Sequence, residues 1–494
     1  MADRPNLVFI FSDQQRYDTL ACYGNDWIQT PAINALADHS FVFQNAYVTQ
    51  PVCTPARASL LTGLYPHSAG PTVNKMALPA DRQSIAEMLP DYYRCAYFGK
   101  WHLGDDTVAQ HGFEDWISVE DGHRRELSRP EYRSILSDYH RHLVENGFEP
   151  DSELMALPIF TADARAQLPE EFQMASFLGD RAAEFIEEAG DEPFVLYVST
   201  FEPHSPYYGP LNDLYDPSTL PVGPAFLKRP EGGSRYNRVR ADFFTHALES
   251  EDGNVDPYIQ TQIATFNDVT TEDGWRTLRA RYMANITLVD RMVGKITRAL
   301  DRARLSGNTA VVFTSEHGEM GGDHGMLEKR SPYEEASRVP LLIRAPWLSN
   351  GQRKVGGSVS QIDLVPTLLD LLGQPAPGHL QGKSLVPAMR GERTLEDNDV
   401  IIEWNGISEI EDRHLGSLEI NLRNTQPWRT IVRGRWKLNL CATDQCELYD
   451  LENDPHELCN LFDDPAQQER VRDLSGRVRD WQARTGDTAP LPRA

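Results

Sequence analysis

Short apolar segments alternate with longer amphipathic segments through the first three quarters of the chain. Six apolar segments rich in β-branched and aromatic residues predict strands: 7–11, 41–48, 94–98, 194–199, 309–314 and 341–344. Between them, apolar positions recur with helical spacing, most clearly over 175–189 and 277–305. Nearly continuous apolar strands that alternate with helices are typical of a parallel sheet buried on both faces. The pattern therefore predicts an α/β sandwich with a largely parallel central sheet.

The pattern changes near residue 380. A helical stretch over 362–373 ends at a glycine, and Pro375, Pro377 and Gly378 follow it. Beyond this point lie four short strand candidates and one amphipathic helix: 400–404, 428–432, 436–440, 447–450 and about 465–485. We therefore expect a large domain over residues 1–380 and a small α+β domain over 381–494, with an antiparallel sheet and a terminal helix. Two charged stretches, 121–169 and 216–273, predict long surface excursions that shape substrate access.

Composition narrows the classes of partner. The 494 residues carry a formal net charge of -25, with 40% hydrophobic and 24% charged residues, as expected for a globular protein. This charge disfavours nucleic acid, whose phosphates it would repel. No stretch has the length of apolar sequence that a membrane span needs, so no membrane partner is expected. Because the whole chain is negatively charged, any pocket that binds an anion must contain a local cluster of basic residues.

The cysteines and the N-terminus bear on location. Six cysteines are scattered along the chain without a small-domain disulfide framework, and a bridge between Cys441 and Cys446 is conceivable but not favoured. The first apolar segment runs directly into Ser12 and Asp13, which predicts a buried strand and not a signal peptide. As given, the chain is expected to be cytoplasmic, or periplasmic or secreted if an export signal has been removed.

Two predicted strands end in residues that could bind a cation. Asp13 and Gln14 follow the first strand, and Glu316 and His317 follow the strand over 309–314. Ligands of open α/β sheets bind at the carboxyl ends of the strands. Two carboxylates, an amide oxygen and an imidazole would form a mainly oxygen site for a hard divalent cation. The alternative is that the acidic residues cap helices and the histidine is hydrogen-bonded within the core.

The most informative motif is Cys-x-Pro-x-Arg, from Cys53 to Arg57, followed by a helical turn of small residues. Alone, it could also be a buried cysteine before a helix that begins with proline. The other motifs follow in order along the chain: Asp13-Gln14, Gly-Lys-x-His-x-Gly at 99–104, Phe-Glu-Pro-His at 201–204, a Gly-Asp-His-Gly block with a lysine at 322–329, Arg-Val-Pro at 338–340 and the tail at 448–457. Together they resemble the type I, formylglycine-dependent sulfatases of the alkaline phosphatase superfamily.

The resemblance implies a sulfuric ester hydrolase with an alkaline-phosphatase-like sandwich. Cys53 would be oxidised to formylglycine by a formylglycine-generating enzyme during maturation. The formylglycine would bind one divalent cation, Ca²⁺ in the first place with Mg²⁺ or Mn²⁺ as alternatives. The other ligands would be Asp13, Gln14, Glu316 and His317.

The resemblance also implies a role for each catalytic residue. Arg57 and the cation acidify the hydroxyl of the formylglycine hydrate that attacks sulfur. Lys100 and Lys329 hold the sulfate oxygens. His204 lies beside the leaving-group oxygen, and it or Lys329 protonates the departing alcohol. His102 is the base whose action expels sulfate and restores the aldehyde.

Glu316 departs from the family pattern, which usually has Asp at this position. Ca²⁺ tolerates variable geometry and bidentate carboxylates, so Glu316 is kept as an expected ligand. Its longer side chain could instead indicate a shifted or weakened site, or degenerate activity.

Three functions remain open at this point. The first is hydrolysis of a sulfated saccharide or a small aryl or alkyl sulfate. The second uses the same machinery on phosphonate monoesters or phosphodiesters, because tetrahedral anions of similar size fit the same cradle. The third is a non-catalytic protein that binds sulfated ligands and whose cysteine is never converted. Four residues next to the motifs could stack on a sugar or aryl ring: Trp101, His111, Tyr207 and Tyr208.

Overall fold

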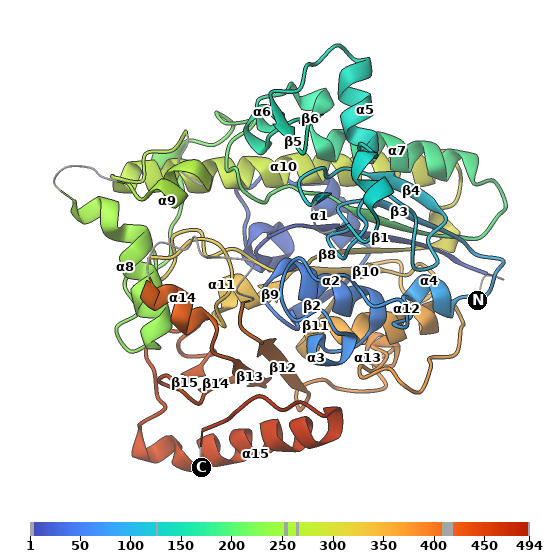
Figure 1. The fold of residues 1–494 in the computed structure, drawn as a ribbon. Coiled ribbons are helices and arrows are strands. Elements are labelled where there is room, and N and C mark those ends of the chain that lie inside the picture. The colour runs from blue at the N-terminus through green and yellow to red at the C-terminus, as the bar shows by residue number, and fades with distance from the viewer. Residues whose placement is uncertain (1–3, 125–126, 251–254, 263–265, 408–417, 493–494) are drawn as a thin grey trace.

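A nine-stranded sheet forms the centre of the molecule (Figure 1). The computed structural model describes residues 4–124, 127–250, 255–262, 266–407 and 418–492. The strands are β1 (Asn6–Ser12), β2 (Phe41–Tyr47), β3 (Arg94–Gly99), β4 (Asp115–Ser118), β7 (Phe194–Ser199), β8 (Thr309–Ser315), β9 (Arg338–Val339), β10 (Leu341–Arg344) and β11 (Arg353–Ser360). Their order is β11-β2-β10-β8-β1-β7-β3-β4, and β9 pairs with β2 outside this path.

The sheet is largely parallel, as the sequence predicts. Pairs β1–β7, β1–β8, β3–β7, β3–β4 and β2–β11 are parallel, whereas β10 runs antiparallel to β2 and β8. All six predicted strands are confirmed. Three strands of this sheet, β4, β9 and β11, were not predicted, because none of them has a continuous apolar run.

Alternate positions of the central strands face two hydrophobic cores. On β1, Val8 and Ile10 pack with α7 and α10, whereas Leu7 and Phe9 pack with α2 and α12 on the opposite face. The bounds of these helices are α2 Cys53–Thr62, α7 Met174–Glu188, α10 Glu272–Arg302 and α12 Leu364–Leu371. Both long predicted helices are confirmed, and α10 begins earlier than predicted because the Thr271 side chain caps it by accepting from Gly274 N. These layers confirm the α/β sandwich.

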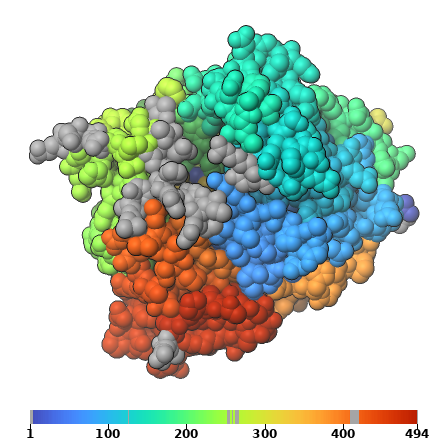
Figure 2. Space-filling model, in the orientation of Figure 1, coloured from blue at the N-terminus to red at the C-terminus, as the bar shows by residue number. Residues whose placement is uncertain are grey.

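Shorter elements surround the two cores. They are α1 (Pro31–Ala37), α3 (Pro66–Ala69), α4 (Ile85–Met88), α5 (Asp138–Glu145), β5 (Ser152–Leu154), β6 (Leu157–Ile159), α6 (Ala162–Ala166), α8 (Arg235–Glu249), α9 (Pro257–Gln262), α11 (Glu334–Ser337) and α13 (Val386–Met389). The excursion over 121–169 contains α5, α6 and the β5–β6 hairpin, and it projects at the top of Figures 1 and 2. The excursion over 216–273 contains α8 and α9. Their role in substrate access stays a prediction.

The C-terminal part forms the expected second sheet. Its strands β12 (Asp399–Trp404), β13 (Trp428–Arg433), β14 (Trp436–Cys441) and β15 (Glu447–Asp450) pair antiparallel in that order. Helix α14 (Leu418–Asn424) precedes β13, and α15 (Gln468–Thr485) is the last helix. Ile401 faces α15, whereas Val400 and Ile402 join the core of the large sheet. A domain boundary at residue 380 stays a prediction.

Two further expectations concern cysteines and membranes. Cys441 and Cys446 are free thiols, so the bridge that was not favoured is not formed. Within the described residues, no helix combines the length and the hydropathy that crossing a bilayer requires.

An ion pair between the half-buried His67 of α3 and the buried Glu403 of β12 provides a test of stability. His67 Nδ1 lies 2.6 Å from Glu403 Oε1, and its Nε2 lies 3.2 Å from the Thr485 carbonyl oxygen. Burial disfavours the charged form of His67, but the hydrogen bond to Glu403 outweighs it and raises the pKa of His67 above 6.5. The stabilisation that this ion pair gives to the folded state is therefore fully present below pH 6.5, and it is lost as the pH rises through the folded-state pKa of His67.

We expect His67→Gln to lower the free energy of unfolding by about 1–2 kcal/mol at pH 6 and by less at pH 9. Urea unfolding of both proteins at the two pH values measures this difference. A difference that grows with pH would contradict the assignment.

Candidate active site

Two neighbouring strands bring the predicted cation ligands to one edge of the sheet. Strands β1 and β8 are parallel, with Ser12 opposite Ser315, and the Glu316 backbone N donates to Ser12 O at 3.1 Å. The residues that follow therefore leave both strands at the same level. One ligand atom from each of four buried residues lies within 4.8 Å of the others: Asp13, Cys53, Glu316 and His317. The structure thus places these four predicted residues together.

Helix α2 fixes Cys53 at its first position. Every residue of this helix is buried, and Cys53 is 2% exposed. The start of the helix is tied down through Thr54, whose backbone N donates to Asn74 Oδ1 at 3.0 Å and whose Oγ1 donates to His102 O at 2.8 Å. Cys53 Sγ lies 3.3 Å from His317 Nε2. The cysteine therefore sits on a rigid element that points into the cluster.

A network of buried charges surrounds the cysteine. Arg57 donates to Lys100 O at 2.6 Å and to Ser199 Oγ at 2.8 Å, and its guanidinium is ion-paired with Glu316. Lys100 Nζ lies 2.6 Å from Asp13 Oδ2. Burial alone would raise the pKa of Asp13, but the positive charge of Lys100 and its other neighbours holds it well below its usual value. Asp13 is therefore an anion.

The surroundings of the Asp13 carboxylate indicate a binding site for a cation. Its Oδ1 atom is buried and accepts no hydrogen bond from any residue in the described part of the chain, and His317 Nε2 lies 3.9 Å from an Asp13 oxygen. An unpartnered buried carboxylate oxygen is unfavourable unless a cation or another donor satisfies it. Carboxylates, an amide and an imidazole are ligands that suit Ca²⁺ and related hard cations. The residues present therefore fit a divalent cation.

Lys329 links Gln14 to His204. Its Nζ donates to Gln14 Oε1 at 2.6 Å and lies 2.9 Å from His204 Nε2. Burial, followed by the charge of Lys329, holds the pKa of His204 well below 6.5. His204 is therefore a neutral imidazole that accepts from the lysine. The pair can hold a proton at the edge of the cluster.

His102 is a second neutral histidine of the site. Its backbone has a φ of 58°, and its backbone N donates to Asp106 Oδ1 at 2.9 Å. Burial, followed by the charge of Lys100, lowers the pKa of His102 well below 6.5. Its Nδ1 is buried and has no hydrogen-bond partner among the residues that are described. The ring can therefore accept a proton.

The predicted aromatic contacts are in part wrong. Trp101 and Tyr207 have no exposed surface, and Trp101 packs edge-on against Tyr97 at 4.9 Å within the core. Tyr208 is also buried, and its hydroxyl donates to Asp163. The rings of Trp101 and Tyr207 therefore cannot stack on a ligand, whereas Tyr208 lines a small pocket together with His204, so its contact with a substrate stays a prediction. His111 is half-buried and stacks on Trp101 at 5.9 Å.

Sequence reasoning missed several residues that hold the site in place. Ser199 accepts from Arg57, Asn74 accepts from the start of α2, and Asp106 accepts from His102. Ser199 ends a predicted strand, so the rule that strand ends carry functional residues could have found it. Asn74 and Asp106 lie in loops without a comparable signal.

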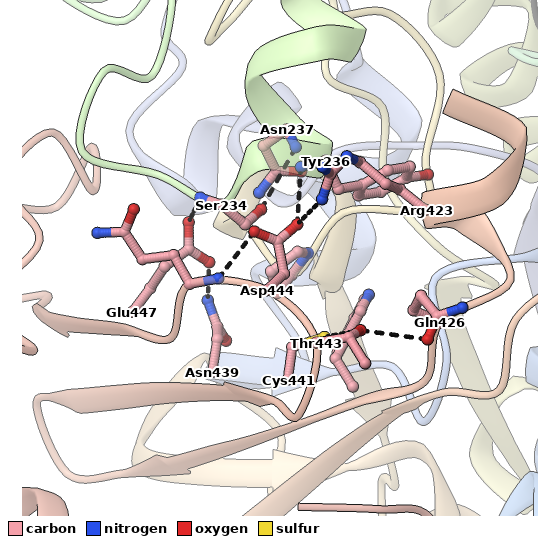
Figure 3. Close-up of a pocket in the computed structure, with 13 residues that line it drawn as sticks. Ser234, Tyr236, Asn237, Arg423, Gln426, Asn439, Cys441, Thr443, Asp444 and Glu447 are labelled. Carbon is pink, nitrogen blue, oxygen red and sulfur yellow. Dashed lines mark hydrogen bonds and ion pairs between the residues drawn. The ribbon is translucent and has the colours of Figure 1, made fainter. Parts of the chain in front are cut away.

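A separate cavity of about 100 Å³ lies between α8, α14 and the C-terminal sheet (Figure 3). None of the predicted site residues lines it. Asp444 accepts from the Tyr236 backbone N at 2.9 Å and lies 3.4 Å from Arg423, so its charge is already paired within the wall. The cavity is therefore not a candidate for the chemistry.

Comparison with known proteins extends over the whole chain. The family model described as sulfatase matches residues 5–374, and the model described as N-sulphoglucosamine sulphohydrolase, C-terminal, matches residues 322–484. The chain is 30% identical to the uncharacterized sulfatase YidJ of Escherichia coli over 476 residues, 93% of this chain and 84% of that protein. It is 24% identical to an N-acetylglucosamine-6-O-sulfatase of Bacteroides thetaiotaomicron, with 99% of this chain and 88% of that protein covered. The structure of a phosphonate monoester hydrolase from Silicibacter pomeroyi superposes with a TM-score of 0.77 and 26% identity, over 98% of this chain and 96% of that chain.

Proposed function

The chain belongs to the sulfatase family and is a sulfuric ester hydrolase of the alkaline phosphatase superfamily, and from this premise we propose its machinery. We propose that Cys53 is converted to formylglycine by a maturation enzyme. We also propose that the site holds one divalent cation, with Ca²⁺ as the leading candidate. The observation that carries the proposal is the buried cluster of Asp13, Cys53, Glu316 and His317. Gln14 would complete the ligand set. The bound formylglycine and cation would supply the nucleophilic oxygen and polarise the ester.

The two buried lysines would bind the sulfate group of the ester. Lys100 lies against Asp13 and Lys329 against Gln14, so both ammonium groups flank the proposed cation ligands. Their charges would hold two sulfate oxygens and offset the charge that builds up during transfer. Arg57, which is ion-paired with Glu316, would keep the nucleophilic oxygen deprotonated.

The two neutral histidines would move protons. His204 receives a hydrogen bond from Lys329, so this pair can deliver a proton to the departing alcohol at His204 Nε2 or Lys329 Nζ. His102 is held neutral next to Lys100 and would accept a proton in the step that releases sulfate. The lowered pKa of His102 supports its role, because a protonated His102 could not act as a base. The neutral His204 can pass on only a proton that it receives from Lys329.

The substrate proposed is a sulfated saccharide, with small aryl or alkyl sulfates as simpler alternatives. One relative that covers nearly the whole chain is named as an N-acetylglucosamine-6-O-sulfatase, and another as a choline-sulfatase. A second candidate is a phosphonate monoester or phosphodiester, favoured by the similarity to the phosphonate monoester hydrolase structure. The sulfatase relatives favour an enzyme over the non-catalytic alternative.

Two measurements test the proposal. The mass of the tryptic peptide of residues 17–57, from protein co-expressed with a formylglycine-generating enzyme, reports whether Cys53 is an aldehyde or a thiol. The ratio of kcat/KM for 4-nitrophenyl sulfate to that for an aryl phosphonate monoester then decides between the two ester classes. A Cys53 that remains a thiol in fully active protein would refute the nucleophile. A higher kcat/KM for the phosphonate would favour the second candidate.

A further inference from the structure

Glu319 lies behind the proposed cation site and contacts one of its ligands. This carboxylate is 1% exposed and follows His317 by two residues. Its Oε2 atom accepts from Gln14 Nε2 and from the Tyr207 hydroxyl, the latter at 2.7 Å. Tyr207 also accepts from Gln14 Nε2 at 2.6 Å. Three fully buried side chains therefore meet at the amide nitrogen of Gln14.

The other oxygen of Glu319 is occupied by the backbone. Oε1 accepts from Gly321 N at 2.9 Å and from Glu328 N at 2.7 Å. A carboxylate offers about four acceptor positions, and four donors fill them here. Both oxygens of Glu319 are therefore held in place as acceptors. A group that faces its Oε2 atom must be a donor.

This requirement fixes which way the Gln14 amide points. The NH₂ group faces Glu319 and Tyr207, so Oε1 faces the opposite side, where it accepts from Lys329 Nζ at 2.6 Å. A flipped amide would set its oxygen against the Glu319 carboxylate and its NH₂ against the Lys329 ammonium. Both contacts would be repulsive. The backbone of Gln14 is fixed as well, because it has a φ of 68° and its carbonyl accepts from Tyr282 at 2.8 Å.

We infer that Glu319 is a positioning residue that acts through Gln14 and makes the amide present its oxygen to the cation and to Lys329. Hard cations bind amide oxygens and not amide nitrogens. A partner behind a ligand that sets its orientation is typically worth about 10- to 100-fold in metal affinity. The inference rests on the proposed function only in placing a divalent cation beside Gln14.

Calcium binding to the full-length protein tests this inference without an activity assay. The protein is matured with a formylglycine-generating enzyme, stripped with a chelator and titrated with Ca²⁺ by calorimetry. We expect Glu319→Gln to raise the Kd for Ca²⁺ by about 10- to 100-fold, because the new amide can donate to Gln14 and allows it to flip. We expect the double variant Gln14→Glu with Glu319→Gln to restore the Kd to within about 3-fold, since Glu at position 14 has an oxygen at either end.

Two further variants serve as controls. Glu335→Gln removes another buried carboxylate near Glu319. In the described part of the chain, no hydrogen bond or ion pair joins the Glu335 side chain to Gln14 or Lys329, so the Kd should not change. Tyr207→Phe leaves the bond between Gln14 and Glu319 in place, so the Kd should change by no more than about 3-fold. A larger change in Tyr207→Phe would show that the tyrosine orients the amide and would overturn the inference.

The remaining outcomes are also decisive. A Glu319→Gln protein that binds Ca²⁺ as tightly as the wild type would overturn the inference, and so would a double variant as weak as the single one, which would reveal a packing role. Wild-type protein that binds no Ca²⁺ would overturn it together with the proposed cation. Wild-type protein that binds Ca²⁺ but hydrolyses no sulfate ester would leave the inference standing and refute the proposed function.

Discussion

Cys53→Ala is expected to lower kcat/KM for an aryl sulfate by about 10⁴-fold or more, because the proposed nucleophile is lost from a site whose groups act as a unit. Binding of the ester by the lysines would survive, so the loss should appear in kcat and leave KM nearly unchanged. Steady-state kinetics on protein matured in parallel with the wild type measure this effect. The variant is a mild structural change, since Cys53 packs at the start of a rigid helix.

Cys95→Ala is the matched control for this prediction. Cys95 is also a buried free thiol, but it lies within β3 and belongs to the hydrophobic core. Its removal should lower stability slightly and leave kcat/KM within about 3-fold, because a small core truncation leaves the site intact. A Cys53→Ala enzyme that retains more than a tenth of wild-type kcat/KM would refute the assignment of the nucleophile.

Glu316→Ala should be the most damaging change among the proposed cation ligands. Glu316 is fully buried, is ion-paired with Arg57 and lies 3.0 Å from His317 Nε2, so its removal leaves a buried guanidinium without one of its counter-charges. We expect Ca²⁺ affinity to fall by about 100-fold or more, and kcat/KM to fall by a similar factor. Calorimetry and metal analysis of the purified protein measure the first effect, and kinetics measure the second.

Glu316→Asp separates the charge of this residue from its length. If the carboxylate acts as a ligand, the shorter side chain keeps the charge, and both quantities should stay within about 10-fold of the wild type. Glu316→Gln keeps the length and loses the charge, so it should resemble Glu316→Ala in metal affinity. A Glu316→Ala protein with full activity and full metal content would exclude this residue as a ligand.

The central strands were predictable because they are buried on both faces. Such strands carry continuous apolar runs, as in β1 and β8, and the sequence pattern identifies them directly. Strand β11 was missed because it lies at the edge of the sheet, with exposed basic residues and two adjacent glycines in its sequence. An edge strand is exposed to solvent along one side, so its sequence carries many polar residues. Its hydrophobic pattern therefore resembles that of a loop.

The residues that gather at the candidate site could be predicted from the sequence, whereas the residues that hold them in place could not. Residues whose types carry chemistry, such as Lys100 and His102, are visible in short motifs. Trp101 lies between them in sequence, yet its side chain packs in the core, because adjacency along the chain does not determine where a side chain points. Ser199 and Glu319 contribute only as hydrogen-bond acceptors for other residues, and only the folded chain shows which residue each one serves.

The burial of Cys53 imposes an order of events on biosynthesis. Under the proposed conversion, a maturation enzyme would have to bind the chain around this cysteine, yet in the folded protein the whole of α2 is enclosed and its first residue faces the interior. The proposed conversion would therefore have to finish while the segment is still unfolded. The enclosing strands β1 and β8 come from opposite parts of the sequence, and such long-range parallel pairing is slow to form. The fraction of Cys53 that is converted would then depend on the rate of modification relative to the rate of folding. Slower synthesis or a lower growth temperature would therefore raise the specific activity of a preparation.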